Sequence, residues 1–97
     1  MKLRYTPRAN AELAEVLDYI AERSPQGARR VQMRIQAMTH LLLQYPYVGQ
    51  LTDLETMRRI VTTPYPYFIF YEVTDDEIIV VGVRHSARDP SSMPDHQ

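Results

Sequence analysis

Residues Tyr67 to Thr74, with the sequence YFIFYEVT, decide how the rest of the chain can fold. Aromatic and β-branched residues fill this stretch, and both types favour β-strands. Successive side chains of a strand point to opposite faces of the sheet, so bulky apolar groups would lie on both faces here. Such a strand belongs in the centre of a sheet, and we predict one from Tyr67 to Thr74.

Strand-forming sequence continues on both sides of this central stretch. Met57 to Thr63 is rich in β-branched residues, and a turn that contains two prolines joins it to the central strand. Asp75-Asp76 predicts a tight turn into a third strand from Glu77 to His85. Because short turns join antiparallel neighbours, the second half of the chain predicts a three-strand meander, preceded by a polar loop from Gln50 to Thr56.

Two helices are predicted before the strands. Thr6-Pro7 supplies an N-cap and a first helical residue, since threonine can accept from a free amide and proline has no amide to leave unbonded. This helix should run to about Arg23. Ser24-Pro25 repeats the same start for a second helix that ends near Gln44. So short a link between them predicts an antiparallel helical hairpin.

Each predicted helix carries one apolar stripe at spacings of three and four residues, as a helix that packs on a core requires. The stripes are Leu13, Val16, Leu17 and Ile20 on the first helix, and Ala28, Val31, Ile35, Met38 and Leu42 on the second. We expect the charged residues on the other side of the first helix to lie in solvent. These are Arg8, Glu12, Glu15 and Glu22.

The order of the elements predicts the fold class. Lys2 to Tyr5 alternates charged and apolar residues and predicts an N-terminal strand. Helices on one side of a mainly antiparallel sheet form an α+β domain of two layers. The chain has 97 residues, which suits a single domain over residues 1–90, and its polar end predicts a loosely ordered tail over residues 91–97.

Composition excludes several kinds of site. The chain has no cysteine, and its histidines (His40, His85 and His96) are scattered, so we expect no metal site. Three glycines form no phosphate-binding loop, and we expect no cofactor. The longest apolar run, Ile78 to Val83, is far shorter than the about 20 residues that span a membrane. The N-terminus lacks the apolar core of a signal peptide, and the expected location is the cytoplasm.

The charge balance bears on nucleic-acid binding. The net charge is −1 and Lys2 is the only lysine, whereas broad or sequence-specific nucleic-acid binding usually needs a basic surface. A local arginine site is still compatible with these numbers.

Such a site is predicted at one end of the sheet. Arg58-Arg59 open one strand, Arg84-His85 close another, and Arg88 follows at once. Antiparallel strands could bring these groups together. Arginine offers a rigid fork to phosphate or carboxylate, and histidine exchanges a proton near neutral pH. Tyr71 on the strand between them would add a hydroxyl. The residue types alone leave a second reading open, in which the arginines are exposed edge residues and the histidine is packed.

The aromatic residues suggest a partner surface. Seven of the nine aromatic residues lie between residues 45 and 71: Tyr45, Tyr47, Tyr65, Tyr67, Phe68, Phe70 and Tyr71. A strand of aromatics is usually core, but a helical hairpin covers one face of a sheet only. The second face would then be available to a partner, since aromatics and arginines are the usual anchors of interfaces.

Several motifs resemble a known family. They are Tyr5-Thr6-Pro7-Arg8-Ala9, Leu13-x-x-Val16-Leu17-x-Tyr19-Ile20-Ala21, Arg58-Arg59, Pro66-Tyr67-x-Ile69-x-Tyr71 and Ile79-x-Val81-x-x-Arg84-His85-x-x-Arg88-Asp89-Pro90. In this order, from Lys2 to Pro90 and without an insertion, the chain resembles the ParE-type toxins of the ParE/RelE toxin–antitoxin superfamily.

The resemblance implies a toxin of a type II toxin–antitoxin system in complex with a cognate, ParD-like antitoxin. Toxins similar to ParE poison DNA gyrase, whereas those similar to RelE cleave mRNA on the ribosome with basic residues and a tyrosine or histidine. A single lysine and a net charge of −1 favour gyrase inhibition over the ribonuclease alternative, so whether the chain is an enzyme stays open. An inactive or retargeted relative is a third reading.

Candidate site residues follow from the two mechanisms. The target-binding candidates are Arg59, Arg84, His85 and Arg88. The catalytic candidates in the ribonuclease alternative are Arg59, Tyr71, Arg84 and His85. The candidates for antitoxin binding are Leu17, Ile20, Tyr65 and Tyr67.

Overall fold

A computed structural model describes residues 1–54 and 56–87 of the chain. The candidate Arg88, the predicted domain end at residue 90 and the predicted tail over residues 91–97 lie outside the described residues. The elements, in chain order, are β1 (Lys2–Tyr5), α1 (Pro7–Ala21), α2 (Pro25–Gln44), β2 (Gln50–Leu51), β3 (Met57–Val61), β4 (Tyr67–Val73) and β5 (Glu77–His85).

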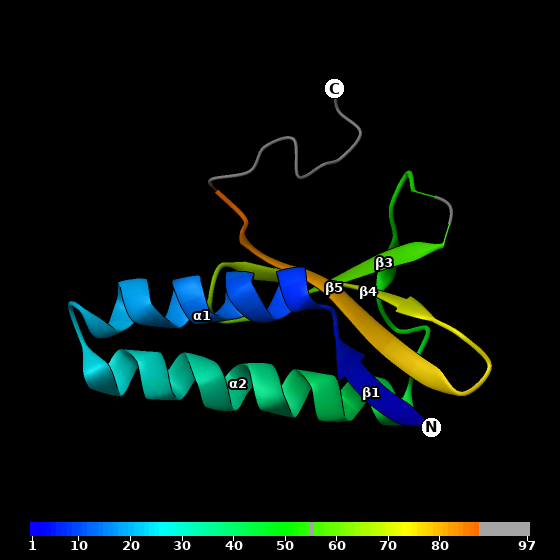
Figure 1. Cartoon of the computed structure of the whole chain (residues 1–97), viewed down its shortest axis with the longest axis horizontal. Coiled ribbons are helices and arrows are strands. Elements are labelled where there is room, and N and C mark those ends of the chain that lie inside the picture. Colours follow the sequence, from blue (N-terminus) through cyan, green and yellow to red (C-terminus); the bar gives the residue numbers. More distant parts are fainter. Residues whose placement is uncertain (55, 88–97) are drawn as a thin grey trace.

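One five-stranded sheet contains all the strands, in the order β1-β5-β4-β3-β2. β1 pairs with β5 in parallel, and the other three pairs are antiparallel. The predicted central strand is β4, which lies between β5 and β3 (Figure 1). The α+β class that the sequence predicts is therefore confirmed.

The predicted loop before the meander was wrong in part. Gln50 lies opposite Arg59 and Leu51 opposite Arg58, so a short edge strand precedes β3 and the meander has four strands. Two residues are too few to show the alternation that marks a strand, and only pairing with β3 defines them.

Both helices begin as predicted. The Thr6 hydroxyl accepts a hydrogen bond from the amide of Ala9 at 3.0 Å, and the Ser24 hydroxyl accepts from the amide of Gly27 at 2.9 Å. α1 ends at Ala21, and the two helices run antiparallel beside each other (Figure 1). Among the described residues, neither helix has the length and hydropathy that crossing a membrane requires.

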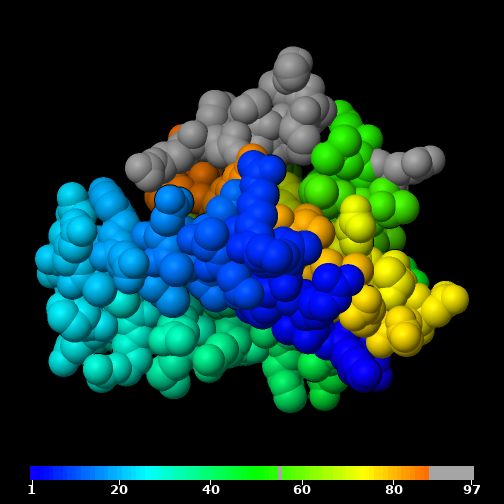
Figure 2. Space-filling model, viewed as in Figure 1, coloured from blue at the N-terminus to red at the C-terminus, as the bar shows by residue number. Residues whose placement is uncertain are grey.

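The core lies between α2 and one face of the sheet. Ile35 is 2% exposed and packs in a cluster that includes Tyr67, Ile69 and Val83. A second cluster contains Leu42, Tyr71 and Ile78. The apolar stripe of α1 is only partly buried and packs against the first cluster: Leu13, Val16, Leu17 and Ile20. In the space-filling view of Figure 2, α1 lies between α2 and β5.

Candidate functional site

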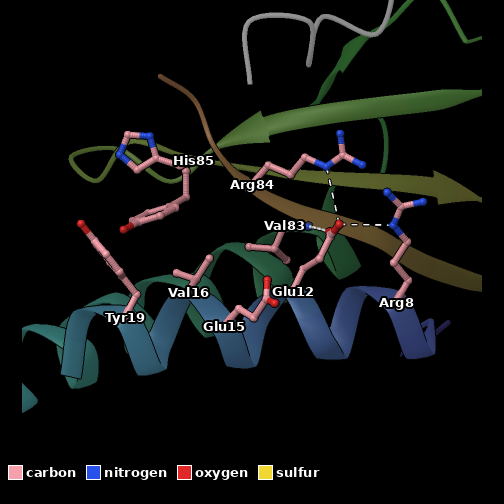
Figure 3. A pocket seen from close by; sticks show the side chains of 9 residues that line it. Arg8, Glu12, Glu15, Val16, Tyr19, Val83, Arg84 and His85 are labelled. Carbon is pink, nitrogen blue, oxygen red and sulfur yellow. Dashed lines mark hydrogen bonds and ion pairs between the residues drawn. The ribbon is translucent and has the colours of Figure 1, made fainter. Parts of the chain in front are cut away.

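A groove forms where β1 leaves the sheet. β1 pairs with β5 only as far as Val80, whose carbonyl accepts a bond from Thr6 at 3.0 Å. The chain then enters α1, and α1 instead of a strand lies beside the rest of β5. The resulting groove has a volume of about 830 Å³ (Figure 3). α1 contributes Arg8, Glu12, Glu15, Val16 and Tyr19 to its lining. The strands contribute Tyr67, Val83, Arg84 and His85.

Glu12 joins α1 to β5 across this groove. Its Oε1 accepts a hydrogen bond from the amide of Val83 at 2.9 Å. Its Oε2 accepts from Nε of Arg8 at 3.3 Å and forms an ion pair with Nε of Arg84 at 3.6 Å, as the dashed lines of Figure 3 show. The prediction that Glu12 lies in solvent was therefore wrong. An amide at a strand edge needs an acceptor when no neighbouring strand supplies one, and Glu12 supplies it here.

Gly82 makes room for this carboxylate. A Cβ at position 82 would lie 3.2 Å from Oε1 of Glu12, closer than ordinary contacts allow. The φ angle of Gly82 is not positive, so the backbone conformation does not require glycine here. The close approach of the Glu12 carboxylate to the strand therefore favours glycine in the middle of β5, because a larger residue would displace the carboxylate by a few tenths of an ångström.

Two of the arginines predicted to bind the target, Arg59 and Arg84, lie on the face of the sheet that α2 does not cover. The guanidinium of Arg59 lies over the ring of Phe68, 4.5 Å from its centroid. Phe68 is also directly opposite Arg84 in the β4–β5 pair, and opposed residues point to the same face. Tyr67 and Ile69 belong to the core cluster, so Phe68 between them faces away from it. We call this surface the open face.

A second cavity, of about 310 Å³, lies on the open face. The sheet contributes Met57, Phe70, Val81, Gly82 and Arg84 to its lining, and Arg8 and Leu54 complete it. Arg8 and Arg84 thus line both the groove and the cavity of the open face. They form the boundary between the two.

His85 lies apart from Arg59. It is opposite Tyr67 in the sheet, and the two rings meet edge to face with centroids 5.2 Å apart. Nδ1 of His85 accepts a hydrogen bond from the amide of Ala87 at 3.0 Å. The proton of the neutral ring is then on Nε2. The structure therefore places His85 in the groove and Arg59 on the open face, with Arg84 at the boundary.

Tyr71 is not near the arginine–histidine end of the sheet. Its side chain is fully buried, and its hydroxyl accepts from the amide of Gly49 and donates to the carbonyl of Pro46, both at 2.8 Å. Three residues of strand, about 10 Å, separate it from Phe68. Burial raises the pKa of Tyr71 above its usual value, although the Gly49 amide and the charge of Arg58 act to lower it. The phenol is therefore a neutral, structural group at physiological pH.

Arg58 serves the same loop as Tyr71. Nη1 of Arg58 donates to the carbonyl of Gly49 at 2.7 Å and to that of Tyr47 at 3.2 Å. The guanidinium lies 5.0 Å from the centroid of the Tyr47 ring. The two adjacent arginines thus have different surroundings: Arg58 holds the loop after α2, and Arg59 lies on the open face. Nothing in the Arg58-Arg59 dipeptide distinguishes them, because only the strand register assigns each one its neighbours.

The residues predicted to bind an antitoxin are only partly accessible. Tyr67 is 7% exposed and lines the groove, while Leu17, Ile20 and Tyr65 are partly buried against the core. Tyr19 is 49% exposed on the groove wall, and sequence reasoning did not select it. Its position next to the apolar stripe of α1 could have indicated that Tyr19 lines this groove. Within the described residues, no three potential ligands of a metal ion lie together.

Known proteins match the chain over most of its length. The profile of the ParE toxins of type II toxin–antitoxin systems (parDE) matches residues 3–90. A protein of Caulobacter vibrioides described as Toxin RelE2 is 39% identical over 84 residues, which cover 87% of this chain and 93% of that protein. The putative toxin Y4kP of Sinorhizobium fredii is 34% identical over 85 residues, covering 87% and 88%.

Solved structures give the same fold. A chain of the chromosomal ParDE toxin–antitoxin system from P. aeruginosa superposes with a TM-score of 0.75 at 20% identity, covering 88% of this chain and 95% of that one. The fold and the matched residues lead to one conclusion: this chain belongs to the ParE toxin family of type II toxin–antitoxin systems.

Proposed function

We propose that this toxin arrests growth by binding DNA gyrase, and that a cognate antitoxin protein neutralises it in the cytoplasm. The observation that carries the choice of gyrase over mRNA is that the predicted proton-transfer residues, His85 and Tyr71, do not lie together, and that neither shares the open face with Arg59. Arg59 and Arg84 flank Phe68 on the open face, His85 lines the groove, and Tyr71 is buried further along β4.

A ribonuclease requires a different arrangement. Its general acid and base must reach atoms of one phosphodiester, at hydrogen-bond distance or through one water. Tyr71 cannot do this without losing its bonds to Gly49 and Pro46. The charge supports the same choice, since a net charge of −1 with one lysine is unfavourable for ribosomal RNA contact.

The open face suits a protein surface with carboxylates. Arg59 presents its guanidinium over the Phe68 ring, and Arg84 lies directly opposite Phe68 in the sheet. Arginine and aromatic residues dominate the energetics of protein interfaces. Each charge-assisted bond from such an arginine contributes about 1.5–3 kcal/mol. Gyrase would be held by this face.

The antitoxin would occupy the groove between α1 and β5. Val16, Tyr19 and Tyr67 offer apolar and aromatic surface there, and Arg84 and His85 offer polar contacts. An extended segment of the antitoxin could cover these residues and touch Arg84 from the groove side. Neutralisation would then follow from occupation of a residue that the target also uses, within a hetero-oligomeric complex.

One observation favours the alternative, a ribosome-dependent mRNA endoribonuclease. The stacking of Arg59 on Phe68 next to Arg84 also fits a nucleobase and its phosphate. Toxin RelE2 of Caulobacter vibrioides carries the name of the ribonuclease branch. In this case His85 would be the remaining candidate for proton transfer.

Expression without the antitoxin distinguishes these functions. The chain is induced alone, and broken chromosomal DNA and new mRNA 5′ ends are measured in the same cultures. We expect DNA breaks without ribosome-dependent mRNA ends, and rescue when the reading frame next to the gene is co-expressed. New mRNA ends in the coding regions of translated messages, with intact DNA, would contradict gyrase as the target.

A further inference from the structure

We propose that Glu12 is a positioning residue that holds Arg84 in place before a partner binds. The inference deepens the proposed function. It rests on that function only where Arg84 is taken to bind the target. Glu12 is on α1 and Arg84 is near the end of β5, so the two come together only in the folded chain.

The two oxygens of the Glu12 carboxylate have separate partners. Oε1 is fixed by the amide of Val83, the residue before Arg84. This bond sets the carboxylate at one position along β5 and limits its rotation. Oε2 then faces Nε of Arg8 and Nε of Arg84 at 3.3 and 3.6 Å. β5 carries Arg84, and through the amide of Val83 it also orients the Glu12 carboxylate that holds Arg84.

Charge explains why the carboxylate is needed at this point. Arg8 and Arg84 approach the same oxygen, and two guanidiniums this close repel each other unless an anion lies between them. The Glu12 side chain is 20% exposed and that of Arg84 37%, so solvent screens their contact less than it screens a fully exposed pair. Figure 3 shows Glu12 between the two arginines.

The position of Arg8, Glu12 and Arg84 explains how this contact would affect the binding of a partner. Arg8 and Arg84 line both cavities, so Glu12 sets where the boundary between the groove and the open face lies. A free arginine side chain has many rotamers, and a partner that binds it must fix them. If Glu12 fixes Arg84 beforehand, the partner loses less entropy on binding.

Gly82 is an independent sign that the chain accommodates this carboxylate. Any side chain at position 82 would press on Oε1 of Glu12. A residue without Cβ in mid-strand costs stability, and here it allows the carboxylate to reach the backbone of β5.

The substitution Glu12→Gln separates the two roles of Glu12. The amide oxygen of glutamine can still accept from Val83, so the strand edge remains satisfied and the chain should fold. The NH₂ group would face Arg8 and Arg84 and repel both. Glu15→Gln is the matched control, because Glu15 is an exposed carboxylate on the same helix and the same groove.

The first readout is the side chain of Arg84 in the free protein. The Nε–Hε signal of Arg84, assigned by its loss in Arg84→Ala, is followed by ¹⁵N relaxation. We expect an ordered signal in the wild type and in Glu15→Gln, and a mobile one in Glu12→Gln. An equally ordered signal in Glu12→Gln would overturn the proposal, and this result would not depend on what the toxin binds.

The second readout is growth arrest. Glu12→Gln should need about two- to fivefold more toxin to stop growth, the effect of losing a partly exposed ion pair, with unfolding temperature nearly unchanged. In an Arg84→Ala background the same change should have no further effect. Additive losses in the double variant would overturn a role through Arg84. Full toxicity of Arg84→Ala alone would instead overturn the proposed role of Arg84 in target binding.

Discussion

The amide of Gly49 donates a 2.8 Å hydrogen bond to the hydroxyl of Tyr71, 22 residues later in the chain. The same hydroxyl donates to the carbonyl of Pro46. A Cβ at position 49 would collide with the Tyr71 ring, so glycine is required by this contact and not by a positive φ angle. The loop after α2 is thereby fastened to the central strand of the sheet.

Replacement of Tyr71 by phenylalanine should lower stability without a separate loss of activity. The change leaves the buried amide of Gly49 and the partly buried carbonyl of Pro46 without their partner, at a cost of about 1–3 kcal/mol. Urea unfolding measures this cost, and Tyr47→Phe, at a tyrosine that is 65% exposed, is the control. Loss of toxicity at temperatures where Tyr71→Phe is fully folded would instead assign Tyr71 a catalytic role.

Replacement of Arg84 by alanine should weaken the target complex at least tenfold. A charge-assisted bond from an arginine contributes about 1.5–3 kcal/mol to binding, whereas a half-exposed arginine adds little to folding stability. The affinity for purified gyrase is measured beside that of Arg30→Ala, whose arginine is exposed on α2. Equal affinities of the two variants would remove Arg84 from the proposed interface.

Replacement of His85 by glutamine distinguishes the two mechanisms. If the chain binds gyrase, His85 makes at most a modest contact, and toxicity should decline only slightly. If the chain cleaves mRNA with His85 as general acid or base, the rate should fall about 10²–10⁴-fold while binding persists. RNA ends are sequenced after induction of each form. Abundant ends that disappear in His85→Gln would establish the ribonuclease reading.

Replacement of Ile35 by alanine tests the packing of α2. Ile35 is 2% exposed, so its truncation should cost about 2–5 kcal/mol. Glu15→Ala, on the exposed side of α1, should change the unfolding free energy by little. Similar losses in both variants would mean that the helices present other faces to the sheet.

The contact between Arg4 and Glu77 should make stability depend on acid pH. The hydrogen bond from Arg4, at 3.2 Å, lowers the pKa of Glu77, and its charge acts in the same direction while desolvation opposes both. Because the folded pKa is lower than the unfolded value of about 4.3, the contribution is complete above that pH and is lost as the pH falls further. The difference in unfolding midpoint between wild type and Glu77→Gln should therefore shrink below about pH 4. A difference that is constant down to pH 2 would contradict this linkage.

The sequence was sufficient for six of the seven elements that the structure describes, and for their order along the chain. Helix starts depend on neighbours along the chain, and Thr6 and Ser24 cap the helices as predicted. The apolar period of α2 selected five residues, of which the core buries Val31, Ile35, Met38 and Leu42, while Ala28 is only partly buried. The YFIFYEVT stretch did form the central strand. These features are local, so they can be predicted from the residue types and their spacing. The short β2 was missed because its pairing partner lies outside its own sequence.

Only the tertiary structure decided which side chains form the site. The register between β4 and β5 shifts at Phe70 and Tyr71, whose partners are Gly82 and Val80. Without this bulge, continued pairing from the Asp75-Asp76 turn would place Arg84 opposite Tyr67, on the helix-covered face. One extra residue in a strand reverses the face of all that follow, so the bulge sends Arg84 to the open face and His85 to the groove. The position of Glu12 also depends on the tertiary structure. The helical period predicts that Glu12 faces solvent, but its side chain is mostly buried, because β1 ends early and leaves an amide of β5 that needs an acceptor.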